Sequence, residues 1–269
     1  ANTANELGMP FAGHVPVAVG IHSALELGIA TIDHLDGYMA AMMPANTDRS
    51  GGYGGFLDVL LANEVDPDLI GSLAEATAAA GTWNVPTQSL FEHRVGDFTV
   101  VELRNRPEMQ FMPNATVEQW ARAKERQLNE RGFDEKVAAR AVQIRRKLIL
   151  ALHQAGAGLL LGSDAPQVFN VPGYSIHQEL EFLVEAGLTP FEALQTGTTA
   201  AADFIGSDTG VVAVGKQADL ILLDANPFVD IRNVQRIHGV MLRGHWYSRA
   251  DLVQRLASIS AGIEQGSRR

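Results

Sequence analysis

The sequence contains no cysteine. Disulfide bonds are therefore excluded, and any transition-metal site must use histidine and carboxylate ligands. The chain also lacks an apolar run approaching the length of about 18 residues that a membrane-spanning helix needs. The printed residues show no basic segment followed by an apolar stretch, which is the pattern of a secretory signal. The compartment stays open, with the cytoplasm as the default expectation.

Positive charge is scarce as well. Lysine and arginine total 21 residues against 31 aspartates and glutamates, which gives a formal net charge of −10 and a pI of about 5.2. An acidic surface repels phosphate backbones and anionic lipids, so nucleic acids and membranes are poor candidate partners. The 46% hydrophobic content of the 269 residues is ordinary for a globular protein. We expect a small molecule or a peptide as the partner.

Short apolar segments alternate with helical ones, which predicts βα units and a parallel sheet. The predicted strands cover residues 9–14, 28–34, 82–87 and 158–164. The predicted helices between and after them cover residues 16–28, 66–80, 176–187 and 189–206. Asp66 and Thr189 stand as N-caps, each followed by a proline at the first helical position.

The longest interval between predicted strands is an excursion over residues 88–155. Its middle is charged and helix-prone, and the pattern predicts two helices with a break near Gly132. After Gly206 the pattern changes to short β-prone runs with turn signals. We predict a small β unit over residues 206–248, closed by an amphipathic helix over 249–269.

Three predicted strands end in a side chain that can bind a metal: His14, His34 and Asp164. In βα barrels the functional residues lie at the carboxyl ends of the strands, so these three are the metal-ligand candidates. Each also has a simpler interpretation, because Asp164 can be a turn residue and either histidine can be a core or capping residue. Strand alternation directs Asp33 to the face opposite His34.

Other candidates for substrate contact are weaker. His93 and Gln88 follow the third predicted strand, and His177 lies thirteen residues after Asp164. Specificity in such barrels resides in the loops after the strands, here residues 35–56, 88–113 and 165–174. Arg94 or Gln88 in the second of these loops is a candidate to recognise a carboxylate or an amide.

Four ordered segments resemble the second half of the amidohydrolase superfamily, in the branch that contains imidazolonepropionase-like enzymes and Xaa-Pro dipeptidase-type peptidases. They read HVPVAVGIHSALELGIATIDH, GLLLGSDAP, HQELEFLVEAGLTPFEALQTGTTAAADFIG and GVVAVGKQADLILLDANPFVDI. The resemblance places His14, His34 and Asp164 at the ends of barrel strands 5, 6 and 8. It implies an α/β fold consisting of strands 5–8 of a TIM-like (β/α)8 metallo-hydrolase barrel over residues 1–205, plus a small C-terminal β-sandwich portion.

The resemblance also implies a chemistry. One or two divalent ions, with zinc first, activate water to cleave a C–N bond of an amide, a cyclic amide or a peptide. Asp164 is then a metal ligand and the acid–base catalyst, and His34 is a metal ligand that helps hold the substrate carbonyl. The family's His-x-His pair and bridging lysine have no counterpart in these residues. We therefore expect an incomplete fragment with weak metal binding and little turnover.

Two other interpretations stay open at this stage. The first is a non-catalytic half-barrel that pairs with itself, or with a missing N-terminal half, through its open sheet edges. The second is a related barrel hydrolase that acts on phosphoesters or lactones, since metal–hydroxide chemistry is common to both.

Overall fold

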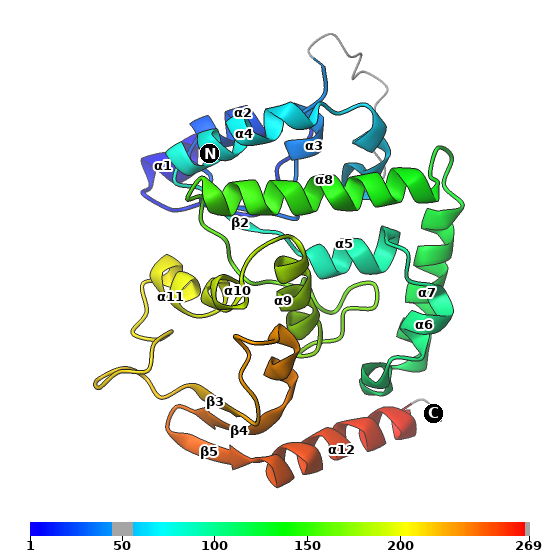
Figure 1. Cartoon of the computed structure of the whole chain (residues 1–269), viewed down its shortest axis with the longest axis vertical. Coiled ribbons are helices and arrows are strands. Elements are labelled where there is room, and N and C mark those ends of the chain that lie inside the picture. The colour runs from blue at the N-terminus through cyan, green and yellow to red at the C-terminus, as the bar shows by residue number, and fades with distance from the viewer. Residues whose placement is uncertain (45–55, 267–269) are drawn as a thin grey trace.

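The computed structural model describes residues 1–44 and 56–266, with side chains described up to Ile263 (Figure 1). Its centre is a parallel β arrangement in which the four predicted strand segments lie side by side in chain order. β1 (Thr31–Asp33) pairs with β2 (Trp83–Val85), with Thr31 opposite Trp83. Single parallel bridges join Gly13 to Ile32 and Asn84 to Leu159. The sequence thus predicted the order and direction of these segments correctly.

The predicted lengths of the outer two strands were wrong. Residues 9–14 contribute only the bridge at Gly13, whose φ of 115° departs from regular strand geometry. Residues 158–164 contribute only the bridge at Leu159. Gly158 and Gly162 pack so closely on β2 that an added Cβ would lie 2.2 Å from Trp83 and 2.5 Å from Val85. Glycine there permits a close backbone approach rather than an extended ladder.

Helices cover one side of this arrangement. α8 (Glu135–Gln154) begins at Asp134, whose side chain accepts from two backbone N–H groups, and it packs against α4 (Ile70–Ala79). Its buried apolar positions recur every three or four residues and form a stripe on the main core, as expected for an amphipathic helix. Apolar members of this stripe include Val137, Ala141, Ile144, Leu148 and Leu152.

The remaining N-terminal elements are short. They are α1 (Asn2–Glu6), α2 (Gly20–Glu26), α3 (Tyr38–Ala41), η1 (Phe56–Asn63) and η2 (Pro67–Leu69). The helix predicted from residue 16 begins only at Gly20, after a turn. The helix predicted over 66–80 is confirmed as η2 followed by α4, and Asp66 caps it by accepting from the backbone N–H of Asp68. Residues 45–55 of the predicted loop 35–56 lie outside the described residues.

The excursion contains more helix than the sequence predicted. α7 (Asn114–Leu128) and α8 are the two predicted helices, and the break near Gly132 is confirmed. The predicted loop over 88–113 was wrong, because it contains α5 (Gln88–Val95), α6 (Val100–Arg104) and η3 (Pro107–Phe111). α5 is buried on nearly all sides and carries four buried polar residues, so it shows no apolar periodicity from which to predict it.

Three helices follow the last strand segment: α9 (Ser175–Glu185), α10 (Pro190–Thr196) and α11 (Thr199–Ile205). The predicted cap at Thr189 is confirmed as a complete capping box with Glu192. The single helix predicted over 189–206 is broken at Gly197. An added Cβ there would lie 2.6 Å from the side chain of Leu161.

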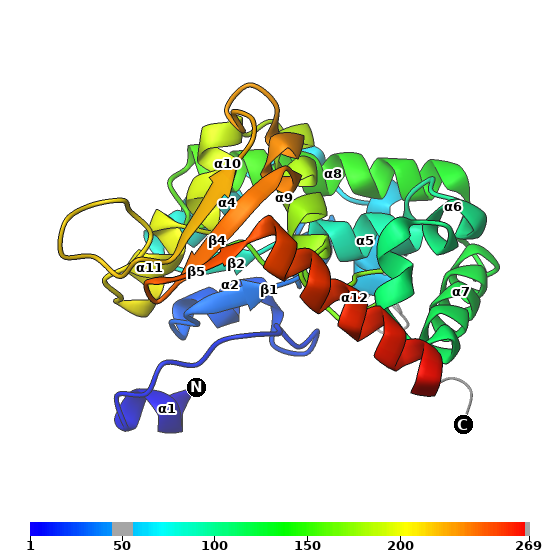
Figure 2. The same ribbon diagram turned by 90° about the horizontal axis from the view of Figure 1, so that it is seen from below.

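The C-terminal unit is a three-stranded antiparallel sheet in the order β3–β4–β5. Its strands are β3 (Leu220–Leu223), β4 (Ile237–Leu242) and β5 (His245–Ser248), with η4 (Ile231–Gln235) between the first two. α12 (Arg249–Gly266) begins where the sequence predicted, contacts β4 and β5, and then extends away from the sheet (Figure 2), where it also contacts η3. The described residues of this unit form one sheet, and the β-sandwich portion that the sequence predicts stays a prediction.

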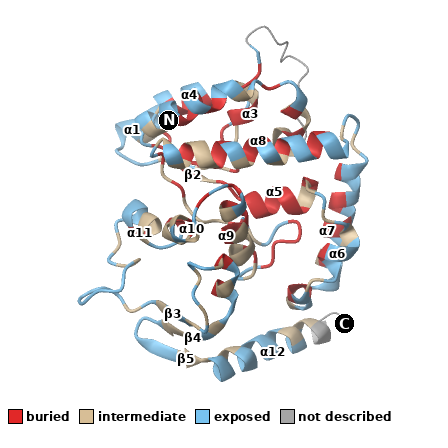
Figure 3. Cartoon of the chain, in the orientation of Figure 1, coloured by how far each residue is buried: buried red, intermediate tan, exposed pale blue. Residues whose placement is uncertain are grey.

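Burial differs between the region around the parallel strands and the C-terminal unit. The helices around β1 and β2 are buried on their inner faces, whereas β3 to β5 and α12 are mostly exposed or half-buried (Figure 3). Within the described residues no helix is long and apolar enough to cross a membrane.

Candidate active site

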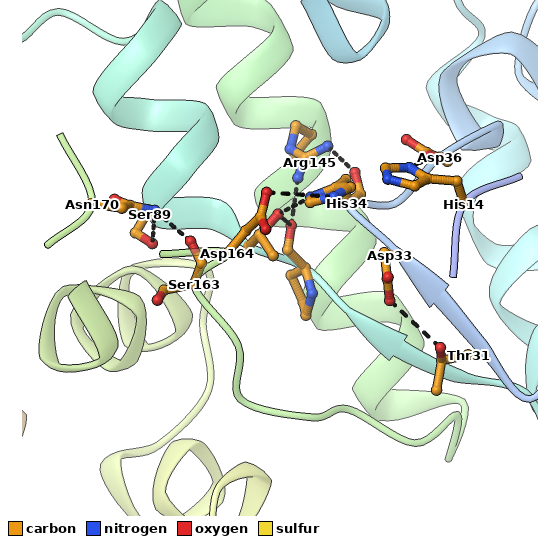
Figure 4. Close-up of polar contacts among 12 residues, drawn as sticks. His14, Thr31, Asp33, His34, Asp36, Ser89, Arg145, Ser163, Asp164 and Asn170 are labelled. Atoms are coloured by element: carbon orange, nitrogen blue, oxygen red, sulfur yellow. Dashed lines mark hydrogen bonds and ion pairs between the residues drawn. The ribbon is translucent and has the colours of Figure 1, made fainter. Parts of the chain in front are cut away.

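The ends of the parallel segments bring the three predicted site residues together (Figure 4). His14 follows the bridge at Gly13, His34 follows β1, and Asp164 ends the segment that begins at Gly158. The ring centroids of His14 and His34 lie 4.8 Å apart. The His34 Nε2 atom lies 3.8 Å from Asp164 Oδ2. Asp33 points away from His34 toward Thr31, as strand alternation predicted.

The backbone at these strand ends is strained. His34, Thr87 and Asp164 have φ values of 58°, 48° and 55°, in the left-handed region that non-glycine residues rarely adopt. Such conformations each cost on the order of 1–3 kcal/mol and persist where the surrounding structure enforces them. Three of the eight described non-glycine residues with positive φ thus lie at these strand ends.

The His34 ring is held in one tautomer. Its Nδ1 lies 2.7 Å from the Thr87 hydroxyl oxygen, which in turn donates to the carbonyl of Pro86 at 2.8 Å. Because the only hydroxyl proton is used there, the Thr87 oxygen accepts a hydrogen bond from His34 Nδ1–H. Burial lowers the pKa of His34, which favours the neutral ring. The Nε2 lone pair therefore faces Asp164.

His14 lies in a different environment. Its side chain is 69% exposed, and its Nδ1 lies 2.7 Å from Asp36 Oδ2. The hydrogen bond to Asp36 raises the pKa of His14, although partial burial acts in the opposite direction. In the neutral ring Nδ1 is the donor to the carboxylate, so Nε2 carries the lone pair. The carboxylate–histidine pairing at His14 is the arrangement that commonly orients metal-binding histidines.

Asp164 is anchored through its neighbour. Asn170 Nδ2 donates to the carbonyl oxygen of Ser163 at 2.5 Å, and Asn170 Oδ1 accepts from His93 Nδ1 at 2.8 Å. Arg106 Nη1 donates to the other ring nitrogen of His93 at 2.7 Å. Burial, followed by the charge of Arg106, lowers the pKa of His93 to about 3. A directional chain thus runs from Arg106 to the residue before Asp164.

The weaker candidates lie in different surroundings. His93 and Gln88 are fully buried, and their polar atoms contact other protein groups. In this arrangement they hold neighbouring protein groups in place and do not face an open surface at which a substrate could bind. His177 is half-buried, and its Nδ1 is buried without a hydrogen-bond partner in the described part of the chain. Arg94 stacks over the ring of Phe56, with 3.9 Å from its guanidinium carbon to the ring centroid.

The sequence did not predict two buried ionic residues behind the site. Arg145 of α8 donates to the carbonyls of His34 and Pro86 and to the side chain of Gln88. Glu179 of α9 accepts from the backbone N–H groups of Gln88 and Ser89, at 2.8 and 2.6 Å. Burial raises the pKa of Glu179 to about 7. Both lie on the buried faces of amphipathic helices, so the signal for them was a charge at a core position.

The donor set suits a metal ion in part. No group of three or more histidine, cysteine or carboxylate side chains stands ready to hold an ion in the described ranges. His34 Nε2 and Asp164 Oδ2 nevertheless lie 3.8 Å apart, and both are atoms of types that bind zinc. Two ligands that lie about 2.1 Å from a tetrahedral zinc ion are roughly 3.4 Å apart. This pair fits an ion after a small movement, and the His14 ring lies beside it, with its centroid 4.8 Å from that of His34.

Comparison with known proteins settles the family. The model of the amidohydrolase family matches residues 2–247. The chain belongs to the amidohydrolase family. Its members are generally metal-dependent. Membership and the hydrolases among its relatives make this chain an enzyme by resemblance, and the family implies a TIM-barrel-type α/β class.

Individual relatives of the chain include ochratoxinase of Aspergillus niger, 37% identical over 86 residues, which are 30% of this chain and 17% of that protein. Among solved structures, the bottromycin amidohydrolase matches with a TM-score of 0.64 and 25% identity, over 97% of this chain and 55% of its own. A Xaa-Pro dipeptidase with bound methionine matches with a TM-score of 0.54 and 18% identity, over 92% and 47%. The chain thus spans about half the length of these solved relatives.

Proposed function

We propose that this chain carries part of the active site of a metal-dependent hydrolase that cleaves C–N bonds in amides, cyclic amides or peptides. The observation that carries the proposal is the approach of two acceptor atoms, His34 Nε2 and Asp164 Oδ2, which lie 3.8 Å apart beside the His14 ring. Two facing acceptors repel each other unless a cation or a proton lies between them. The family and the name of the bottromycin amidohydrolase support amide chemistry.

His34, Asp164 and His14 would hold the ion, which we propose to be zinc. When bound, a divalent ion lowers the pKa of a coordinated water and polarises a substrate carbonyl. Asp164 is 41% exposed, so it can reach both the water and a substrate nitrogen. We assign it the proton transfer from the attacking water to the leaving amine. His34, fixed by Thr87, keeps its lone pair available throughout.

The 269 residues supply these three candidate ligands and contain no His-x-His pair. We propose that a fully active site needs further ligands, and that turnover by these residues alone is slow. Because the similar structures include a bottromycin amidohydrolase and a Xaa-Pro dipeptidase, an N-acyl amino acid or a dipeptide is the first substrate to test.

The proposal is tested by amine release under single-turnover conditions, with the protein in excess over N-acyl amino acid and Xaa-Pro substrates. We expect slow release that a chelator stops and added zinc restores, and that is lost in Asp164→Asn. A phosphoester and a lactone serve as contrasting substrates. The proposal is contradicted if the rate of amine release is unchanged both by the chelator and in Asp164→Asn. It is also contradicted if only the phosphoester or the lactone is cleaved.

A further inference from the structure

One side chain outside the strand ends, that of Arg145, contacts the two backbone carbonyls that position His34, namely those of His34 itself and of Pro86. Arg145 of α8 is 2% exposed. Its Nη1 donates to the carbonyl oxygen of His34 at 2.7 Å, and its Nη2 donates to the carbonyl oxygen of Pro86 at 2.8 Å. A planar guanidinium can span two carbonyls at fixed separation, which a lysine ammonium cannot do equally well.

The Pro86 carbonyl links Arg145 to the His34 ring. It accepts from Arg145 and also from the Thr87 hydroxyl, whose oxygen accepts from His34 Nδ1. Arg145 therefore holds the backbone of His34 directly and orients its ring through Pro86 and Thr87. Both His34 and Thr87 have left-handed backbones, so the hydrogen bonds of Arg145 act where the chain is strained.

The hydrogen bonds of Arg145 indicate positioning rather than charge pairing. The three hydrogen bonds go to neutral oxygens, namely two backbone carbonyls and the Gln88 side chain at 3.0 Å. Fully buried Glu179, which accepts from the backbone of α5, is the first of several carboxyl groups whose charges favour the protonated form of Arg145. These hydrogen bonds therefore fix the positions of two backbone carbonyls.

We propose that Arg145 is a positioning residue for His34. It holds the imidazole in the Nδ1–H tautomer, so that the Nε2 lone pair points at Asp164. Arg145 itself touches neither a substrate nor the reacting atoms. The inference rests on the proposed function for the use of that lone pair, whereas the tautomer is a property of the protein alone.

The test is the ¹⁵N NMR signature of the His34 ring in the metal-free full chain, assigned by comparison with His34→Gln. We expect one protonated nitrogen at Nδ1 and one unprotonated nitrogen at Nε2 in the native protein. In Arg145→Met the two resonances should move toward each other as the tautomers mix. Arg145→Lys retains a positive charge near Glu179 and helps the variant fold, but it should show the same change.

Two further variants separate positioning from stability. Thr87→Val removes the acceptor of the Nδ1 proton and should reproduce the change while Arg145 stays in place. Leu148→Ala creates a cavity on the same helix without touching either carbonyl, and it should leave the tautomer unchanged. A folded Arg145→Lys with the native signature overturns the inference. The same shift in Leu148→Ala also overturns it, because loosening of α8 alone would then be sufficient.

Zinc titration provides a second readout. Loss of an outer-shell support usually weakens metal binding by roughly 10- to 100-fold, so we expect that change in Arg145→Lys. If the native chain binds no zinc but its tautomer depends on Arg145, the proposed function fails and the positioning role stands. If zinc binding depends on Asp164 while the His34 tautomer is unchanged in the Arg145 variants, the positioning role fails and the proposed function stands.

Discussion

Two arginines make the same kind of contact in opposite surroundings. Arg145 donates to the carbonyls of His34 and Pro86 and is 2% exposed. Arg249, at the start of α12, donates to the carbonyl of Ile237 and pairs with Asp224, and its side chain is 55% exposed. Water can replace the contacts of the second arginine but has no access to those of the first.

The surroundings therefore decide what each contact contributes. Behind the strand ends, Arg145, Gln88 and Glu179 are buried and hydrogen-bonded, so removing one of them leaves its partners unsatisfied and destabilises the fold. In the C-terminal unit, ion pairs lie in solvent, where such pairs typically contribute little. The first region is suited to holding reactive groups in place, whereas the second tolerates the loss of such contacts.

The largest expected effect that separates the two regions is on stability. Arg145→Met leaves the carbonyls of His34 and Pro86 without their donor and Glu179 without a compensating charge. Breaking such a buried network costs about 3–5 kcal/mol. Urea unfolding, followed by circular dichroism, measures the loss.

The matched control is Arg249→Met. Because water can solvate the Ile237 carbonyl and Asp224, we expect a urea midpoint close to that of the native protein. Equal losses in the two variants would contradict the comparison, since burial would then make no difference to the same contact.

A smaller effect concerns pH. The pKa of His93 in the folded protein is about 3, against an ordinary value near 6.5, because the ring is buried beside Arg106. Between these values the unfolded chain binds a proton that the folded chain does not. Stability is therefore complete above pH 6.5 and falls as the pH is lowered toward 3, by at most about 1.4 kcal/mol per pH unit.

His93→Gln sharpens this prediction. A glutamine amide can donate to Asn170 and accept from Arg106 without titrating. The variant should therefore show a flatter dependence of unfolding free energy on pH between 6.5 and 4. An unchanged slope would mean that other groups cause the acid sensitivity. Asp224 of the exposed unit, whose pKa the hydrogen bond with His238 lowers, should matter only at lower pH.

Much of the fold followed from local patterns. Apolar runs ending in His14, His34 and Asp164 predicted that the parallel segments bring these side chains together, because carboxyl ends of parallel strands meet at one edge. The cap at Thr189 and the start of α12 were also readable from the sequence. The lengths of the outer strands were not, since they depend on how closely Gly158 and Gly162 approach β2.

The supports behind the site could not be predicted in the same way. α5 lacks an apolar period because its polar residues are buried and paired with partners distant in sequence. The contact of Arg145 with His34 spans 111 residues, and that of Gln88 with Glu179 spans 91. A sequence pattern shows which faces of a helix are apolar, but it does not show which distant carbonyl a buried arginine will meet.

The most direct test of the central claim is an equilibrium zinc titration of the native chain, Asp164→Ala, His34→Ala and His22→Ala. His22 is an exposed histidine of α2 and serves as the control. We expect saturable binding of about one ion per chain, at least tenfold weaker in Asp164→Ala and His34→Ala and unchanged in His22→Ala. Equal affinity in all four proteins, or no binding by the native chain, would contradict the claim that the strand ends form a metal site.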